Sequence, residues 1–181
     1  MYDSIRTATA ADAADFAYVL CESWKAAYRD ILTPERLADR TDLARRTAFF
    51  ERLLPDPGCF LALDGGNPCG ICSVSPERSG ELPGWGEVVS LYTLPAYWGS
   101  GLGRALMDRA LDALAAAGYA NVCLWAFEAN GRACRFYEKC GFTRDGARKH
   151  SRFADVPEIR FVRKTFWRKN ASPRAPAAHG T

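Results

Sequence analysis

Hydrophobic positions in the middle of the chain predict a strand, a turn and a helix in succession. Residues 87–93 are rich in β-branched and aromatic side chains, which is typical of a strand. From residue 102 onward, apolar side chains recur at helical spacing, and Gly118 ends the pattern. The apolar face of this expected helix carries Leu102, Leu106, Ala110, Leu114 and Ala117.

The first third of the chain predicts helices. Thr9 and Asp12 have the spacing of a capping box, and apolar side chains from Phe16 to Ala27 follow at helical spacing. Thr33 is followed by a proline and an acidic residue, which indicates the start of a second helix. Residues 43–54 continue the helical pattern until a Pro-Asp-Pro-Gly sequence ends it.

Further strand-like segments lie on both sides of the central helix. Residues 59–63 and 69–75 flank a glycine-bearing turn and predict a β-hairpin. Residues 121–127, 144–150 and 158–164 predict three more strands. A strand–helix–strand crossover joins parallel strands, so we expect one parallel pair in a largely antiparallel sheet. The element order therefore predicts a mixed α/β (α+β) fold.

The turn before the central helix has alternating glycines, Gly99, Gly101 and Gly103, followed by Arg104. Glycine lets the backbone approach an anion with no Cβ in the way, and the first N–H groups of a helix point toward such an anion. The pattern predicts a phosphate site, with a purely structural turn as the alternative. It does not fit the dinucleotide fingerprint, because Leu106 occupies the place of the third glycine, and no Gly-Lys-Ser/Thr follows for a nucleotide-triphosphate loop.

A second segment gives this turn a more specific meaning. Residues 130–142 predict a short helix with Asn130 as its N-cap and Gly141 at its end. Together with the central strand and turn, the segment resembles the GCN5-related N-acetyltransferase (GNAT) superfamily. The resemblance rests on three motifs in order, Glu87-x-x-x-Leu91-Tyr92-Thr93-x-Pro95, Gly99-Ser100-Gly101-Leu102-Gly103 and Asn130-x-x-Ala133-x-x-Phe136-Tyr137-Glu138-x-x-Gly141-Phe142.

This resemblance implies a GNAT fold, in which the sheet is splayed between two central parallel strands and the pantetheine arm of acetyl-CoA lies between them. The arm is then expected to pair with the backbone of Leu91, Tyr92 and Thr93. Asn130 is expected to contact it, although its N-cap role explains the residue nearly as well. Trp98 departs from the family, whose loop often begins with Gln or Arg. The loop expected to grip the diphosphate contains Gly99, Ser100, Gly101, Leu102, Gly103 and Arg104.

The same resemblance suggests two catalytic residues. Tyr137 matches the family tyrosine that commonly protonates the leaving thiolate, and a core aromatic beside Phe136 is the alternative. Glu87 begins the central strand, where many GNAT enzymes have a glutamate that deprotonates the amine through water. A solvated carboxylate at the strand end is its alternative, and Glu128 is the second candidate for the base.

The acceptor site is expected around Trp24, Tyr28, Trp125, Glu128 and the loop over residues 151–157. For Trp24 and Tyr28, packing in the core or at its rim is the alternative explanation.

The function we expect is direct transfer of acetyl from acetyl-CoA to a primary amine of a small molecule or peptide, in a ternary complex. No Cys-His or Ser-His arrangement suggests an acyl-enzyme. A non-catalytic acyl-CoA sensor on the same fold is the alternative.

Length and charge narrow the possibilities further. The chain has 181 residues, 48% of them hydrophobic, and a net charge of +3. These values fit one domain over residues 1–168 with a disordered tail over 169–181, and they argue against a dedicated nucleic-acid binder. No apolar run has transmembrane length and the N-terminus does not resemble a signal peptide, so we expect a cytoplasmic protein without a membrane partner. The oligomeric state stays open, with a homodimer as one candidate.

The cysteine content invites a metal or disulfide interpretation. The chain has seven cysteines, an odd number, and only two histidines. Cys69 and Cys72 form a lone C-x-x-C with no second pair, and apolar neighbours indicate a strand. We therefore expect buried thiols that behave as small hydrophobic side chains, with a redox role as the alternative and no metal site.

Overall fold

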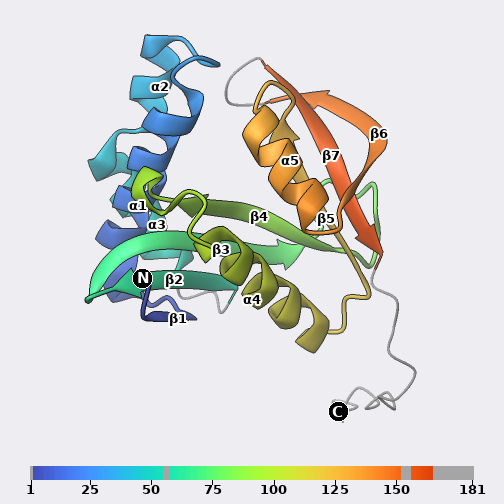
Figure 1. Cartoon of the computed structure of the whole chain (residues 1–181), viewed down its shortest axis with the longest axis horizontal. Coiled ribbons are helices and arrows are strands. Elements are labelled where there is room, and N and C mark those ends of the chain that lie inside the picture. Colours follow the sequence, from blue (N-terminus) through green and yellow to red (C-terminus); the bar gives the residue numbers. More distant parts are fainter. Residues whose placement is uncertain (1, 55–57, 152–155, 165–181) are drawn as a thin grey trace, which may run out of the picture.

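The computed structural model describes residues 2–54, 58–151 and 156–164, in which a seven-stranded sheet carries helices on both faces (Figure 1). The strands are β1 (Ser4–Thr7), β2 (Cys59–Asp64), β3 (Asn67–Pro76), β4 (Gly86–Thr93), β5 (Asn121–Phe127), β6 (Thr143–His150) and β7 (Pro157–Lys164). The helices are α1 (Ala13–Tyr28), α2 (Pro34–Arg40), α3 (Leu43–Leu53), α4 (Leu102–Ala116) and α5 (Gly131–Lys139), with short 3-10 turns η1 (Ala10–Asp12) and η2 (Pro95–Tyr97).

The strands follow the order β1-β2-β3-β4-β5-β7-β6, and β4 and β5 are the pair that runs parallel. The mixed, mostly antiparallel sheet is thus confirmed. The β4–β5 ladder joins Gly86 to Val122 and Glu87 to Cys123, and beyond these pairs the two strands diverge (Figure 1). The expected splay is therefore confirmed as well. It leaves facing backbone edges of β4 and β5 available to a ligand.

Two apolar clusters hold the helices against the sheet. One joins α4 and α5 to one face, and the other joins α1 and α3 to the opposite face, where the rings of Phe16 and Phe50 lie 4.8 Å apart. Ala117 departs from the expected apolar face of α4: it is exposed, because the helix ends at Ala116 and Gly118 then turns the chain with φ 92°. The buried face of α4 consists of Leu102, Leu106, Met107, Ala110 and Leu114.

Side-chain caps explain where the helices begin. Thr9 and Asp12 form the predicted capping box ahead of α1, and Thr33 caps α2. Asn130 accepts a hydrogen bond from the Ala133 N–H at the start of α5, which confirms its N-cap role. These polar groups satisfy backbone N–H donors that a helix leaves unpaired in its first turn.

Cys69 and Cys72 are buried, which confirms the prediction for this pair, and the other five cysteines are buried as well. Burial raises the pKa of the Cys69 thiol to about 11 and that of the Cys123 thiol to about 12. Such thiols stay protonated and unreactive near neutral pH, so the structure favours the packing role over the redox role.

Within the described part of the chain, none of the helices is both long and apolar enough to cross a bilayer. The described residues also contain no cluster of three or more potential metal ligands of the His, Cys, Asp or Glu type. The expected tail, residues 169–181, lies outside the described residues, as do residues 165–168 of the expected domain. The domain boundaries therefore stay a prediction.

Candidate active site

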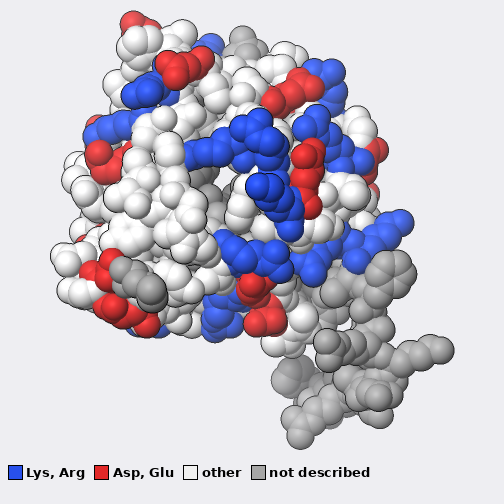
Figure 2. Space-filling view, in the orientation of Figure 1, with Lys and Arg blue, Asp and Glu red and all other residues white. Residues whose placement is uncertain are grey.

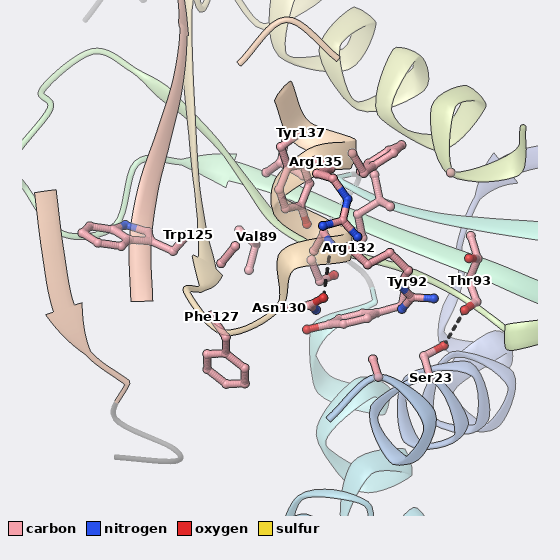
Figure 3. Close-up of a pocket in the computed structure, with 18 of the residues that line it drawn as sticks. Ser23, Val89, Tyr92, Thr93, Trp125, Phe127, Asn130, Arg132, Arg135 and Tyr137 are labelled. Atoms are coloured by element: carbon pink, nitrogen blue, oxygen red, sulfur yellow. Dashed lines mark hydrogen bonds between the residues drawn. The ribbon is translucent and has the colours of Figure 1, made fainter. Parts of the chain in front are cut away.

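A cavity of about 880 Å³ opens where β4 and β5 diverge. Its walls come from α1, β4, β5, α5 and the turn between β4 and α4, and Figure 3 shows side chains from several of these elements around it. The walls also include charged side chains from the segment before β4 and from β6 and β7. Side chains from Ser23 to Glu158 in the sequence thus line one cavity.

The charge of this cavity is strongly positive. Six cationic and two anionic side chains line it, and Figure 2 shows Lys and Arg gathered around a hollow in this face. An excess of cations with aromatic walls fits a ligand that carries phosphates. The cations are Arg78, Arg104, Arg132, Arg135, Lys139 and Lys149, and the anions are Glu87 and Glu158.

The glycine-rich turn forms one rim of the cavity. Gly99 and Gly101 have φ of +80° and +93°, and no atom outside their chain neighbours lies within 4 Å of the place where a Cβ would stand. Their glycine identity is therefore set by backbone conformation and leaves open space beside the backbone. Gly103 belongs to α4, and a Cβ there would lie 3.5 Å from the ring of Phe136.

Two residues of the predicted loop do not line the cavity. The side chain of Leu102 is fully buried in the core against the sheet. Ser100 stabilises the turn: its hydroxyl donates to the Tyr97 carbonyl at 2.8 Å and accepts from the Leu102 N–H at 3.3 Å. Arg104 does line the cavity, and its Nε also binds a carboxylate oxygen of Asp108 at 2.9 Å.

The expected pantetheine edge lies along β4, where Leu91, Tyr92 and Thr93 all line the cavity. The carbonyl of Thr93 already accepts two hydrogen bonds, from Ser23 Oγ at 3.0 Å (Figure 3) and from Trp98 Nε1 at 3.1 Å. A carbonyl oxygen has two lone pairs, so this acceptor is saturated. A ligand that pairs with this edge must use other backbone groups of the segment.

Tyr137, on α5, forms part of the cavity wall (Figure 3). Its ring also packs against the apolar core, 5.7 Å from the ring of Phe161, so the core-aromatic alternative describes part of its role. Burial raises the pKa of the Tyr137 hydroxyl well above its usual range. The group is accordingly a protonated hydrogen donor throughout the physiological range.

Glu87 lines the cavity but is only 2% exposed, so the alternative of a solvated strand-end carboxylate is wrong. Arg78 binds it through three hydrogen bonds: its backbone N–H and Nε contact Oε2 at 3.1 Å, and Nη2 contacts Oε1 at 2.7 Å. A carboxylate has about four acceptor positions, so roughly one is left, on Oε1. Sequence reasoning missed Arg78, because it lies in a polar segment without periodicity, nine residues from its partner.

An aromatic cluster closes the end of the cavity near α1. The ring centroid of Tyr28 lies 4.9 Å from the ring centroids of Trp24 and Phe127, and the ring centroids of Trp24 and Tyr92 lie 6.4 Å apart. Tyr28 is buried, and its burial raises its pKa well above the usual value. Both explanations for Trp24 and Tyr28 therefore apply: they pack into a core and they line the cavity.

The two remaining acceptor candidates lie in different places. Trp125 lines the cavity, and the Lys149 ammonium lies 3.8 Å from its ring centroid. Glu128 pairs with Arg148 and lines a separate, smaller hollow, so the structure does not bring it to the site. The loop over 151–157 lies mostly outside the described residues, since 152–155 are not among them.

Comparison with known proteins identifies the class to which this geometry belongs. Residues 20–142 match the family described as Acetyltransferase (GNAT) family. An uncharacterized N-acetyltransferase of Mycobacterium tuberculosis is 32% identical over 139 residues, which cover 76% of this chain and 86% of that protein. A mycothiol acetyltransferase of Beutenbergia cavernae is 50% identical over 58 residues, 32% of this chain and 20% of that one.

Solved structures agree with these matches. YncA from Salmonella typhimurium, described as a putative acetyltransferase with its cofactor acetyl-CoA, superposes with a TM-score of 0.65 at 26% identity, covering 95% of this chain and 98% of that one. The PaiA N-acetyltransferase of Thermoplasma acidophilum, in complex with coenzyme A, gives a TM-score of 0.68 at 18% identity over 89% and 98%, which concerns the fold alone. The splayed sheet, the cationic cavity and these matches lead to one conclusion: the chain belongs to the GNAT family of acetyl-CoA-dependent N-acetyltransferases.

Proposed function

We propose that the protein transfers acetyl from acetyl-CoA to a primary amine by direct attack in a ternary complex within the cavity between β4 and β5. The observation that carries this proposal is the shared wall: the glycine-rich rim, the β4 edge, Tyr137 and Glu87 all line one cavity. The aromatic cluster and Trp125 offer a surface for the acceptor in the same space. The acceptor is a small-molecule or peptide amine.

The residues present fit acetyl-CoA. The open backbone at Gly99 and Gly101 offers unhindered N–H groups to a diphosphate, and Arg104 adds charge. The unpaired edge of β4 after Glu87 offers backbone groups to the amides of a pantetheine arm, as an added strand would use them. Asn130, whose Oδ1 caps α5, lines the same cavity and can meet the arm with its amide group.

When bound, acetyl-CoA supplies the thioester whose carbonyl carbon the amine attacks and whose sulfur leaves. Tyr137 donates its phenolic proton to that sulfur and recovers a proton from solvent. Glu87 uses its remaining acceptor position to hold a water that takes the surplus proton of the amine, while Arg78 balances the carboxylate charge. Glu128, as the second candidate for the base, is disfavoured by its position outside the cavity.

The proposal is tested by steady-state kinetics over a panel of amines, with free thiol as the readout. Thiol release that depends on the amine, with initial-rate lines that intersect, supports direct transfer in a ternary complex. Parallel lines would indicate an acyl-enzyme and overturn the mechanism. Tight binding of acetyl-CoA without thiol release for any amine would favour the sensor function. The family match favours the enzyme.

A cytoplasmic location and a homodimer are further expectations. Sedimentation of the purified chain tests the second: a mass near 20 kDa would contradict a dimer.

A further inference from the structure

Two side chains from opposite walls of the cavity meet at its rim. Trp98, in the turn between β4 and α4, is 41% exposed, and the guanidinium carbon of Arg132 on α5 lies 3.1 Å from its ring centroid. The indole Nε1 donates to the Thr93 carbonyl at 3.1 Å, which fixes the ring on the β4 side. The stack therefore holds the Arg132 guanidinium at a defined position, facing the glycine-rich turn.

Arg132 differs in its partners from Arg78 and Arg104, two other arginines that line the cavity. Arg78 is bound to Glu87 and Arg104 to Asp108, whereas Arg132 makes no ion pair with any carboxylate among the described residues. Arg132 is exposed overall, and desolvation of its covered part lowers its pKa. Its N–H donors are therefore open to an anionic ligand that enters the cavity.

A second arginine of α5, Arg135, also lines the cavity. Arg135 folds back toward the start of α5, where its Nη1 lies 3.3 Å from the place a Cβ would take on Gly131. Arg132 and Arg135 together make the α5 wall of the cavity cationic.

We propose that Arg132, held in place by Trp98, binds the diphosphate of acetyl-CoA from the α5 side of the cleft, opposite the glycine-rich turn. The inference rests on the proposed function, in which that turn meets the same diphosphate. Stacking uses the flat face of the guanidinium and leaves its in-plane N–H groups free, which is the geometry that bidentate phosphate binding requires. Trp98 is uncharged, but its ring positions the charge of Arg132, which comes from α5 on the opposite wall.

The test compares acetyl-CoA binding to the purified protein by titration calorimetry. Arg132→Ala should raise the Kd roughly tenfold, as expected for the loss of a charge-assisted contact. Trp98→Ala should give a smaller loss, because it removes only the positioning. The double variant should be no worse than Arg132→Ala alone, since the two residues act as a unit. Trp98→Phe should recover most of the loss, because it keeps a ring face for the stack.

The chain offers a matched control. The Arg109 guanidinium lies 4.3 Å from the ring centroid of Phe60, away from the cavity. Arg109→Ala removes a comparable stack and should leave the Kd of acetyl-CoA unchanged.

Truncated ligands identify the phosphate. The penalty of Arg132→Ala should be equal for acetyl-CoA and for its dephospho form, which lacks the ribose 3′-phosphate, and should disappear for acetyl-pantetheine, which lacks every phosphate. A penalty that disappears with the dephospho form would assign Arg132 to the 3′-phosphate and overturn the proposal. An unchanged Kd in Arg132→Ala would also overturn it, while leaving the proposed function intact. Failure of the wild-type chain to bind acetyl-CoA would instead refute the proposed function.

Discussion

At the scale of single residues, burial determines what Tyr137 can do. Tyr137 lines the cavity while its ring packs against the core, and burial raises the pKa of its hydroxyl above the usual range. Tyr137→Phe should therefore lower kcat by about 10²- to 10⁴-fold, the usual contribution of a general acid, with little change in the Kd of acetyl-CoA. Because the raised pKa keeps the phenol protonated, the wild-type rate should show no loss from this group up to pH 10 or so. A tenfold weaker Kd, or an unchanged kcat, would leave Tyr137 with a packing role.

Glu87 invites a comparison with Glu128, since both are ion-paired to arginine and only the first lines the main cavity. Glu87→Gln should reduce kcat/KM for the amine, and the reduction should grow as the pH falls. A typical alkylamine has a pKa of about 10.4, so its neutral form becomes scarcer at lower pH and help from a base matters more. Glu128→Gln is the control and should leave the pH–rate profile unchanged. Parallel profiles for wild type and Glu87→Gln would remove Glu87 from the base role.

At the scale of elements, much of the arrangement could be predicted because the signals are local. The capping box at Thr9 and Asp12, the Asn130 cap and the period of α4 all depend on residues within a few positions of one another. The partners of Glu87 and Trp98 could not be predicted in this way. The contacts of Arg78 with Glu87 and of Arg132 with Trp98 depend on how the sheet and α5 pack in the folded protein. No spacing pattern along the chain predicts such contacts.

The glycine-rich turn shows the same limit, because its three glycines look equivalent in the sequence and are not equivalent in the structure. Gly101 caps α4 with φ +93°, a conformation that a Cβ strains, whereas Gly103 lies within the helix. Gly101→Ala should lower the free energy of unfolding by about 1 kcal/mol or more. Gly103→Ala should leave it unchanged or raise it by up to about 1 kcal/mol, since the new Cβ meets Phe136 at ordinary contact distance. Denaturant titration distinguishes the two, and equal losses would contradict this assignment of roles.

At the scale of the whole molecule, the cleft is the place where two parts of the sheet are joined most sparsely. Only two residue pairs link β4 to β5 within the described residues, and Gly86 lies at that junction. A Cβ on Gly86 would come within 2.7 Å of Leu114, so α4 packs tightly on the sheet at the closed end of the cleft. The molecule is therefore held together by core packing below the cavity, and the open ends of the strands are left to the ligand.

Far from the cavity, Asp12 connects the first strand to the first helix and so affects the stability of the whole fold. Both of its oxygens accept from Arg6 at 2.7 Å, and Oδ2 also accepts from the Thr9 N–H at 2.7 Å. The contact with Arg6 is the main reason that the pKa of Asp12 lies well below its usual range. A lowered pKa stabilises the folded state above the unfolded value of about 3.9, and this contribution is lost as the pH falls toward the folded pKa.

Asp12→Asn should therefore lower the free energy of unfolding at pH 7 by about 1–3 kcal/mol, and the difference from wild type should shrink below about pH 4. Asp108→Asn is the control for charge alone, because its pair with Arg104 is half-exposed on the surface of α4. It should cost less than about 0.5 kcal/mol. Denaturant titrations at pH 7 and in the acid range measure both differences. The difference in unfolding free energy between wild type and Asp12→Asn could instead stay constant into strong acid. In that case the loss would come from packing, and the ionised carboxylate would not stabilise the contact between β1 and α1.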